Sequence, residues 1–287
     1  MRKVVIPAAG LGTRLLPATK EQPKEMLPIF SRSCDDSLCL KPLLQAVFEQ
    51  LYDFGLREFC FIVGRGKRAI EDHFTPDHSN LDMLRSRGKD KPATDLESFY
   101  EKLRASIVIW VNQPEPLGFG DAVLKAKTFV GEEEFLVHAG DTYIVSDSFG
   151  YIERLMDTYR RLGADATFIV KRVEDPRQYG VVRCEAVDQG VYRVIEAVEK
   201  PEVPPTNLAV MPIYIFKSSI FGILSKTRPG RGGEVQLTDG IQGMIGSGLK
   251  VFAIELGENE LWLDIGTPNT YWEALSQSYR SMSPLKG

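Results

Sequence analysis

Short apolar runs alternate with amphipathic segments through the first half of the chain. The runs that predict buried strands lie at 4–6, 59–63, 107–111, 135–139 and 166–170. The segments that repeat apolar residues every three or four positions, and so predict helices, are 42–54, 121–130 and 149–162. Strands that alternate with helices form βαβ units, in which helices cover the faces of the sheet. The pattern therefore predicts an α/β fold with a mixed, mainly parallel central sheet flanked by helices.

The second half of the chain is richer in strands. Residues 179–182 begin a strand that 192–197 joins as a hairpin partner across a turn at 188–190. A further strand-like run ends at Asp264, and a helix is expected over 234–245. We therefore expect a smaller β-rich part beside the main sheet. Ligands in such folds bind outside the carboxyl ends of the strands, so the ends of the apolar runs are the places to look for a site.

Domain organisation follows from where this alternation is interrupted. We expect a single domain over 1–287, closed by a C-terminal helix and tail at 268–287. Residues 75–104 are charged and carry two short apolar patches, which predicts a helical insertion lying over the sheet as a lid or as a subunit contact. Both alternatives stay open. Residues 31–39 are polar and predict an irregular exposed loop.

Composition narrows the class of protein. The chain has 287 residues with 43% hydrophobic and 26% charged residues, as in ordinary soluble proteins, and a net charge of −4. That charge disfavours nucleic acid as a partner. The sequence has no apolar run that would cross a membrane and enters its first strand at once, so we expect a cytoplasmic protein. Its four cysteines lack a Cys-x-x-Cys pair, and Pro76 separates His73 from His78, so a zinc site is not expected.

The first candidate chemistry follows the first strand, where small residues form a loop. Glycines let the backbone approach a ligand closely, and N–H groups turned into such a loop form a nest for phosphate oxygens. Arg14 offers a planar fork and Lys24 a movable point charge. The loop therefore predicts a nucleoside triphosphate site; a glycine turn with incidental basic residues is the alternative. The expected nucleotide-binding residues are Ala8, Ala9, Gly10, Leu11, Gly12 and Thr13.

Two better-known phosphate motifs do not match this loop. The P-loop needs Lys-Ser/Thr after its second glycine, and that pair is missing. The dinucleotide fingerprint Gly-x-Gly-x-x-Gly fails at its last position, which is Leu15.

Polar residues at the ends of later runs complete the candidate site. The amide of Gln113 offers a donor and an acceptor to a base edge, and Gly118 lets its loop pass beneath a flat ring; a Pro/Gly-rich connector is the alternative. Asp141 and Asp264 each end a strand-like run, and Mg²⁺ prefers carboxylate oxygens as ligands. An isolated Asp at such a position is as often the cap of a helix or turn. Residues 199–200 are an adjacent Glu-Lys pair, which suits a phosphorylated sugar because the carboxylate can accept from hydroxyls while the ammonium binds the phosphate. Considered without its neighbours, the same pair would be explained as the solvated end of a strand.

These motifs together resemble a known family. Residues 10–28, with Gly-Leu-Gly-Thr-Arg and Pro-Lys-Glu-Met-Leu-Pro, are similar to the head of bacterial and archaeal UTP–glucose-1-phosphate uridylyltransferases, which are sugar-phosphate nucleotidyltransferases. Asn-Leu-Ala at 207–209 and Glu-x-Gln-Leu-Thr-Asp at 234–239 extend the likeness. Leu-Asp-Ile-Gly-Thr-Pro at 263–268 instead resembles the thymidylyltransferase branch, which leaves the base preference open.

The resemblance implies a fold, a reaction and roles for single residues. It implies a Rossmann-like nucleotidyltransferase fold, with UTP and glucose 1-phosphate as substrates, Mg²⁺ as cofactor and a homodimer or homotetramer. The implied catalytic residues are Arg14, Lys24, Asp141 and Lys200. Gln113 and Gly118 would bind the pyrimidine, Gly180, Glu199 and Lys200 the sugar phosphate, and Asp141 and Asp264 the metal.

Three other functions share part of this pattern. A thymidylyltransferase would need only a pocket that tolerates the 5-methyl group of dTTP. A glycosyltransferase usually carries an Asp-x-Asp metal motif, whereas Asp141 is followed by Thr142 and Tyr143. A non-catalytic sugar-nucleotide-binding regulatory protein would not need all of the cations and carboxylates named above.

Overall fold

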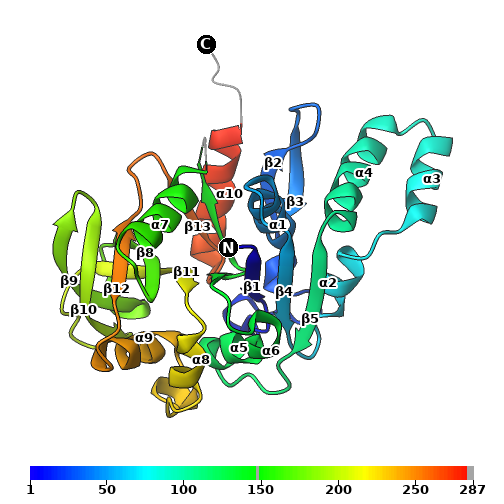
Figure 1. Ribbon diagram of the computed structural model, residues 1–287. Coiled ribbons are helices and arrows are strands. Elements are labelled where there is room, and N and C mark those ends of the chain that lie inside the picture. Colours follow the sequence, from blue (N-terminus) through cyan, green and yellow to red (C-terminus); the bar gives the residue numbers. More distant parts are fainter. Residues whose placement is uncertain (147–148, 283–287) are drawn as a thin grey trace.

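One large sheet organises the molecule (Figure 1). The computed structural model describes residues 1–146 and 149–282. Within these residues the sheet has nine strands. In spatial order they are β5 (Ile107–Asn112), β4 (Glu58–Val63), β1 (Lys3–Pro7), β6 (Phe135–His138), β11 (Leu208–Phe216), β8 (Ala166–Arg172), β12 (Val251–Glu255), β10 (Val191–Glu199) and β9 (Gly180–Asp188).

The sheet is mixed, as the sequence predicts. Strands β5, β4, β1 and β6 pair in parallel, and so do β8 and β12. Strand β11 runs antiparallel to both β6 and β8, and the β9–β10 hairpin pairs antiparallel across Gln189–Gly190, which confirms that predicted hairpin. The α/β class is therefore confirmed, with the parallel strands concentrated around β1.

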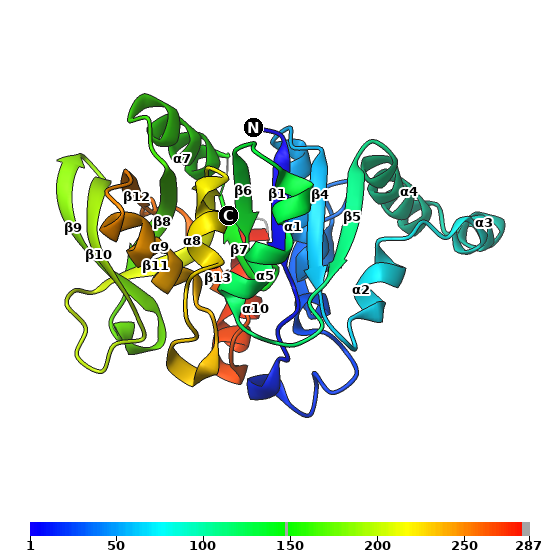
Figure 2. The ribbon, with the colours of Figure 1, turned by 60° about the horizontal axis from the view of Figure 1, so that its bottom comes forward.

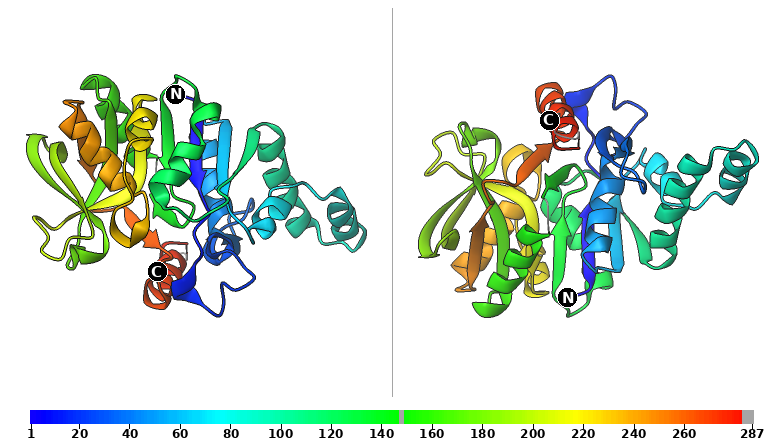
Figure 3. Two further views of the ribbon diagram at one scale, coloured as in Figure 1. Left: turned by 90° about the horizontal axis from the view of Figure 1, so that it is seen from below. Right: turned by 90° about the horizontal axis from the view of Figure 1, so that it is seen from above.

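Helices cover both faces of the sheet, which is why its central strands are continuously apolar. Side chains alternate along β1, so Val4 and Ile6 join one core while Val5 joins the other. Figure 2 turns one helical layer toward the reader, and the two panels of Figure 3 show the layers from opposite sides. The first core receives α1 (Leu43–Asp53) and α7 (Gly150–Arg161), and the second receives α5 (Phe119–Lys125), α6 (Lys127–Val130), α8 (Ser219–Leu224) and α9 (Leu237–Gly246).

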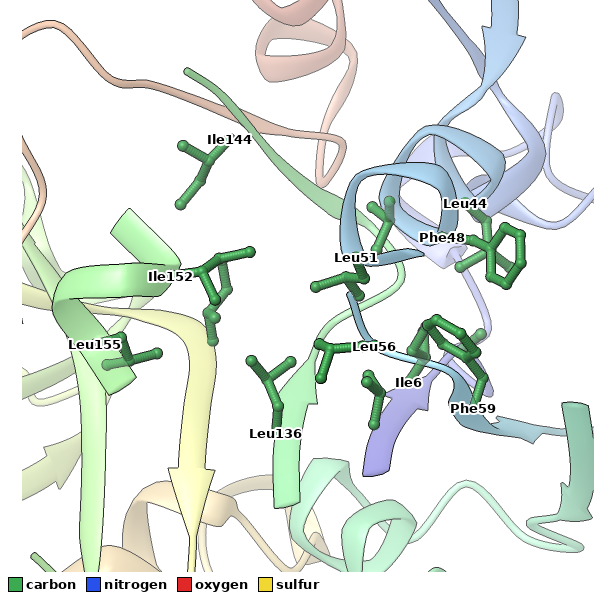
Figure 4. Packing of buried hydrophobic residues seen from close by; sticks show 14 of the residues in the cluster. Ile6, Leu44, Phe48, Leu51, Leu56, Phe59, Leu136, Ile144, Ile152 and Leu155 are labelled. Atoms are coloured by element: carbon green, nitrogen blue, oxygen red, sulfur yellow. The ribbon is translucent and has the colours of Figure 1, made fainter. Parts of the chain in front are cut away.

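Large apolar side chains fill the first core (Figure 4). Leu44, Phe48 and Leu51 of α1 lie over Ile6 and Phe59, and all five are fully buried. The rings of Phe48 and Phe59 lie 4.8 Å apart. Packing of this kind holds β1 rigidly and so fixes the loop that follows it.

Short strands and the last helix lie beside the main sheet. β7 (Thr142–Val145) pairs antiparallel with β13 (Leu261–Asp264), and Asp264 lies opposite Thr142. β2 (Pro28–Arg32) pairs with β3 (Leu38–Pro42), so the exposed loop predicted over 31–39 is limited to 33–37, and its two ends belong to the strands instead. Hydrogen bonds stabilise the turn at 33–37: the Ser33 N–H donates to the Ser37 carbonyl at 2.9 Å, and the hydroxyls of Ser33 and Ser37 each donate to Asp35 Oδ1 at 2.6 Å. Helix α10 (Pro268–Met282) packs on β2 and β13, and the last five residues of the expected tail lie outside the described residues.

The predicted insertion is helical but does not lie over the sheet. It contains α3 (His78–Ser86) and α4 (Asp90–Arg104), preceded by α2 (Arg68–His73). Phe99, Tyr100 and Leu103 of α4 are buried in the first core beside α1 and Phe74, outside edge strand β5. Figures 1 and 2 show α3 beyond α4, at the periphery of the molecule. The apolar face of α4 is thus satisfied at the edge of the sheet, and a subunit contact stays a prediction.

Two predicted helix boundaries also differ from the structure. The helix expected over 121–130 is divided at Ala126 into α5 and α6. The helix expected from 234 begins only at Leu237, because residues 234–236 are held extended by contacts described below. No helix in the described residues is long and apolar enough to span a membrane.

The anchoring of α4 can be tested at Phe99. Its ring is 1% exposed and lies 5.5 Å from that of Phe74 and 6.0 Å from that of Phe48. Phe99→Ala should lower the free energy of unfolding by about 3–5 kcal/mol, because it opens a cavity in the core. Urea unfolding measures this. The control is Glu97→Ala on the same helix as Phe99, which removes a surface ion pair with Arg85 of α3 and should cost less than about 1 kcal/mol. Equal costs would contradict the assignment.

Candidate active site

A cavity of about 380 Å³ opens at the carboxyl end of β1. Most of the residues predicted to bind a nucleotide line it, although they come from distant parts of the chain. Those lining residues are Ala9, Gly10, Leu11, Gly12, Thr13, Arg14, Lys24, Gln113, Gly118 and Asp141. Glu25 and Glu234 also line the cavity.

The glycine loop offers backbone donors to this cavity. The N–H groups of Gly10, Leu11 and Gly12 donate no hydrogen bond to any described residue. Gly12 has a φ of +66°, and its carbonyl accepts from the Thr19 hydroxyl at 2.7 Å, which fixes the turn. Free N–H groups on a fixed loop are suited to binding an anion.

Ala8 differs from the rest of the predicted loop, and its role in nucleotide binding stays a prediction. Its side chain is 1% exposed and belongs to the first core, and its N–H donates to the Ile62 carbonyl at 2.8 Å. Ala8 therefore continues the strand geometry of β1 and borders neither of the cavities described here. The loop begins one residue later than expected.

The loop that follows β5 holds Gln113 beneath the same cavity. Gln113 is 4% exposed, and its Nε2 donates to the Gly118 carbonyl at 3.1 Å and to Asp121 Oδ2 at 2.8 Å. Asp121 stands in the same motif of the sequence, but only the folded chain reveals its contact with Gln113.

Gly118 is required for a reason besides access to a ligand. Its φ is +107°, and a Cβ there would lie 2.6 Å from the Val235 carbonyl oxygen. The Val235 carbonyl accepts from the Gly120 N–H at 2.8 Å, and the Val235 N–H donates to the Leu117 carbonyl at 2.7 Å. These bonds hold residues 234–236 extended against the Gly118 loop and delay the start of α9.

Lys24 and Asp141 line this cavity together, and a second carboxylate, Asp264, lies close to both and lines the larger cavity described below. Asp141 follows β6 and forms an ion pair with Lys24, while the β7–β13 pairing brings Asp264 beside them. Burial raises the pKa of Asp264 to about 6, and the neighbouring charge of Asp141 adds to this. Burial would also raise the pKa of Asp141, but the charge and hydrogen bond of Lys24 lower it. Asp141 is thus the ionised member of the pair.

A second ion pair lies directly behind Lys24. Glu25 and Lys67 are both nearly inaccessible, with Lys67 Nζ 2.7 Å from Glu25 Oε2. Burial would lower the pKa of Lys24, yet the charges of Asp141 and Glu25 raise it, so Lys24 stays charged. The sequence shows Glu25 within the motif but does not reveal Lys67 as its partner, because the two are 42 positions apart.

A larger cavity of about 1180 Å³ lies beside the first. Gly180, Glu199, Lys200 and Asp264 line it, as do Gln236 and Thr238. Glu199 pairs with Lys200 at 2.9 Å and accepts from the Thr238 hydroxyl at 2.7 Å. A Cβ on Gly180 would lie 2.6 Å from Thr238 Oγ1, so glycine is needed here. Thr238 is a further residue whose role the sequence alone did not reveal.

Lys200 has an unusual backbone. Its φ is +43°, in the left-handed region that non-glycine residues rarely adopt. Its N–H donates to the Tyr179 carbonyl at 3.0 Å, which holds this conformation. Strained conformations of this kind gather at functional sites.

The two cavities meet at Arg14, Phe119 and Asp141, which line both. A molecule in one cavity can therefore contact a molecule in the other at these residues. Asp141 and Asp264 provide carboxylate oxygens there that fit a divalent cation, which commonly takes one or two carboxylates and completes its shell with phosphate and water. No cluster of three or more potential metal-binding side chains occurs in the described residues.

Comparison with known proteins identifies the family. A family model described as nucleotidyl transferase matches residues 3–281. The chain belongs to the nucleotidyl transferase family. It is 40% identical to a UTP–glucose-1-phosphate uridylyltransferase of Bacillus subtilis over 245 residues, which cover 84% of this chain and 78% of that protein. The resemblance seen in the sequence is thereby confirmed.

Solved structures of this nucleotidyl transferase family agree with the fold. A UDP-glucose pyrophosphorylase complexed with UDP-glucose superposes with a TM-score of 0.83 at 31% identity, covering 98% of this chain and 99% of the other. A UTP-bound enzyme of the same type from Acinetobacter baumannii gives a TM-score of 0.83 at 30% identity, covering 99% and 95%.

The close packing of Gly118 predicts a large effect of one methyl group. Gly118→Ala should lower the free energy of unfolding by about 2–4 kcal/mol, since it combines backbone strain with overlap against Val235. Gly163→Ala is the control, because Gly163 has a φ of +58° and a Cβ there would meet no atom within 4 Å, and it should cost only about 1–2 kcal/mol. Thermal or urea unfolding of both variants measures the difference. Equal losses would mean that the 234–236 segment yields to the added methyl group.

The raised pKa of Asp264 predicts a pH-dependent stability. An unfolded chain releases this proton at about pH 4, whereas the folded protein holds it to about pH 6. The folded state therefore binds more protons between these values, and the stability that this group contributes falls as pH rises through them. In metal-free buffer, Asp264→Asn should gain about 2–3 kcal/mol of unfolding free energy relative to the wild type between pH 4 and pH 7. A constant difference across this range would contradict the raised pKa.

Proposed function

We propose that this protein transfers a uridylyl group from UTP to glucose 1-phosphate and releases UDP-glucose and pyrophosphate. The observation that carries the proposal is the meeting of two cavities at Arg14 and Asp141. The smaller cavity has a loop of free N–H donors suited to phosphates. The larger cavity has the Glu199–Lys200 ion pair, which is suited to a phosphorylated sugar. The names of the relatives described above support the same pair of substrates.

UTP would occupy the smaller cavity. The loop from Ala9 to Thr13 and the guanidinium of Arg14 would bind the β- and γ-phosphates through charge-assisted hydrogen bonds. The base would lie at Gln113 and Gly118. This arrangement directs the α-phosphate toward Lys24 and Asp141, where the second cavity begins.

Glucose 1-phosphate would occupy the larger cavity. Gly180 leaves room beside Glu199, whose carboxylate can accept hydrogen bonds from sugar hydroxyls. The ammonium of Lys200 would neutralise and orient the sugar phosphate. A phosphate oxygen then attacks the α-phosphorus in line, and the bond to pyrophosphate breaks without a covalent enzyme intermediate. Positioning and charge neutralisation supply the catalysis in such a reaction.

Lys24 is suited to stabilising charge at the α-phosphate. It is held charged by Asp141 and Glu25, and Glu25 is itself paired with Lys67. Asp141 and Asp264 would hold Mg²⁺, and the facing carboxylates fit a divalent cation because one of them is otherwise driven toward its protonated form. When bound, magnesium would neutralise phosphate charge. The homodimer or homotetramer implied by the family stays a prediction.

Pyrophosphate release tests this function. With glucose 1-phosphate, Mg²⁺ and each nucleoside triphosphate in turn, we expect fast release with UTP and loss of release when the metal is chelated. Lys24→Ala and Asp141→Ala should each lower the rate by about a hundredfold or more, as does the loss of comparable charge-stabilising groups. Lys217→Ala, which breaks an exposed ion pair with Asp165 remote from both cavities, is the control and should leave the rate unchanged.

Three results would count against the proposal. Near-wild-type rates in a lysine or aspartate variant would remove that residue from the reaction. Equal rates with dTTP and UTP would widen the activity to a general pyrimidine nucleotidyltransferase, and no release with any pair would favour a non-catalytic binding protein.

A further inference from the structure

The buried amide of Gln113 has a defined orientation. Its Nε2 lies 3.1 Å from the Gly118 carbonyl and 2.8 Å from Asp121 Oδ2. A backbone carbonyl and an ionised carboxylate can only accept hydrogen bonds, so both hydrogens of the amide nitrogen are directed into the protein. The opposite orientation would set Oε1 against two acceptors at a buried position, which is strongly unfavourable.

Asp121 is itself held in place on both sides. It is 6% exposed in the first turn of α5, and its Oδ1 lies 3.2 Å from Lys125 Nζ. One carboxylate oxygen therefore binds the lysine and the other binds Gln113. Among the polar interactions of the described residues, Lys125 binds Asp121 and makes no hydrogen bond to Gln113, so the two interactions of the carboxylate can be separated by mutation.

Only an acceptor remains for a ligand at this point. Gln113 lines the smaller cavity, and its Oε1 has no hydrogen-bond partner in residues 1–146 and 149–282. A site that offers only a hydrogen-bond acceptor can distinguish pyrimidine bases at ring atom N3. N3 of uracil and thymine carries a hydrogen and donates, whereas N3 of cytosine is an unprotonated acceptor.

We propose that Asp121 is a specificity-determining positioning residue, which fixes the Gln113 amide so that the cavity accepts uracil or thymine nucleotides and rejects cytosine nucleotides. This inference rests on the proposed placement of the base at Gln113. UTP and CTP carry the same phosphates and sugar and have similar size, so phosphate binding alone cannot separate them. The orientation of one amide can.

Asp121→Asn tests the proposal with little change in shape. The introduced Asn side chain can rotate to donate to Gln113 Oε1, and Gln113 can then turn its NH₂ group toward N3 of cytosine. Only the Gly118 carbonyl still opposes that orientation. The variant should therefore bind CTP more tightly and UTP more weakly than the wild type does.

Equilibrium binding of UTP, dTTP and CTP, measured by titration calorimetry in the presence of Mg²⁺, gives the required ratios. For the wild type we expect the Kd for CTP to exceed that for UTP by about a hundredfold, because a buried acceptor would face another acceptor. In Asp121→Asn this ratio should fall about tenfold or more. The Kd for dTTP should change in the same direction as the Kd for UTP. Lys125→Met is the matched control and should keep the wild-type ratio.

Each outcome decides between a positioning role and a structural one. If Asp121→Asn weakens UTP and CTP by the same factor, Asp121 only supports the loop and the proposal is overturned. If the wild type binds CTP within about threefold of UTP, the proposal fails without any variant, whether or not Asp121→Asn folds. Selective UTP binding without pyrophosphate release would instead overturn the proposed reaction and leave this inference standing. Failure of every pyrimidine nucleotide to bind would overturn both.

Discussion

The site depends on keeping a partly buried carboxylate ionised in the wall of the smaller cavity. Asp141 follows a fully buried strand, and without a cation nearby it would take up a proton, as its neighbour Asp264 is driven to do. Lys24 prevents this, and Lys24 in turn is kept charged by Glu25, whose own charge is matched by Lys67. These alternating charges connect the loop after β1, the turn after β4 and the end of β6. The positions of the catalytic candidates are therefore set jointly rather than one at a time.

The second organising element is residues 234–238, which comprise the extended segment 234–236 and the start of α9. At one end its backbone bonds to the loop that carries Gly118 and Gly120, and Glu234 lines the smaller cavity. At the other end Thr238 bonds to Glu199 in the larger cavity. The segment thus joins the wall of one cavity to the wall of the other. This explains why a short motif without an evident chemical role is needed: it holds the two walls at a fixed separation.

Much of this could be predicted from the sequence because the signals are local. Continuous apolar runs show which strands are covered on both faces, and the residues at their ends, such as Asp141, fall at the ligand-binding edge for that reason alone. The interactions that could not be predicted join distant positions. The Glu25–Lys67 pair is one case, and the bonds from Val235 that delay α9 are another. An amphipathic pattern shows that α4 has a buried face but not which neighbour covers it, so its place at the sheet edge was missed.

The pairing of β13 with β7 has a consequence for how the protein is made. Asp264 comes from near the end of the chain, whereas Asp141 and the glycine loop are synthesised much earlier. All nine strands of the main sheet precede β13, so a nascent chain can complete its sheet and its glycine loop while one of the two facing carboxylates is still missing. A nascent chain therefore completes the facing carboxylate pair only after β13 has been synthesised and has paired with β7.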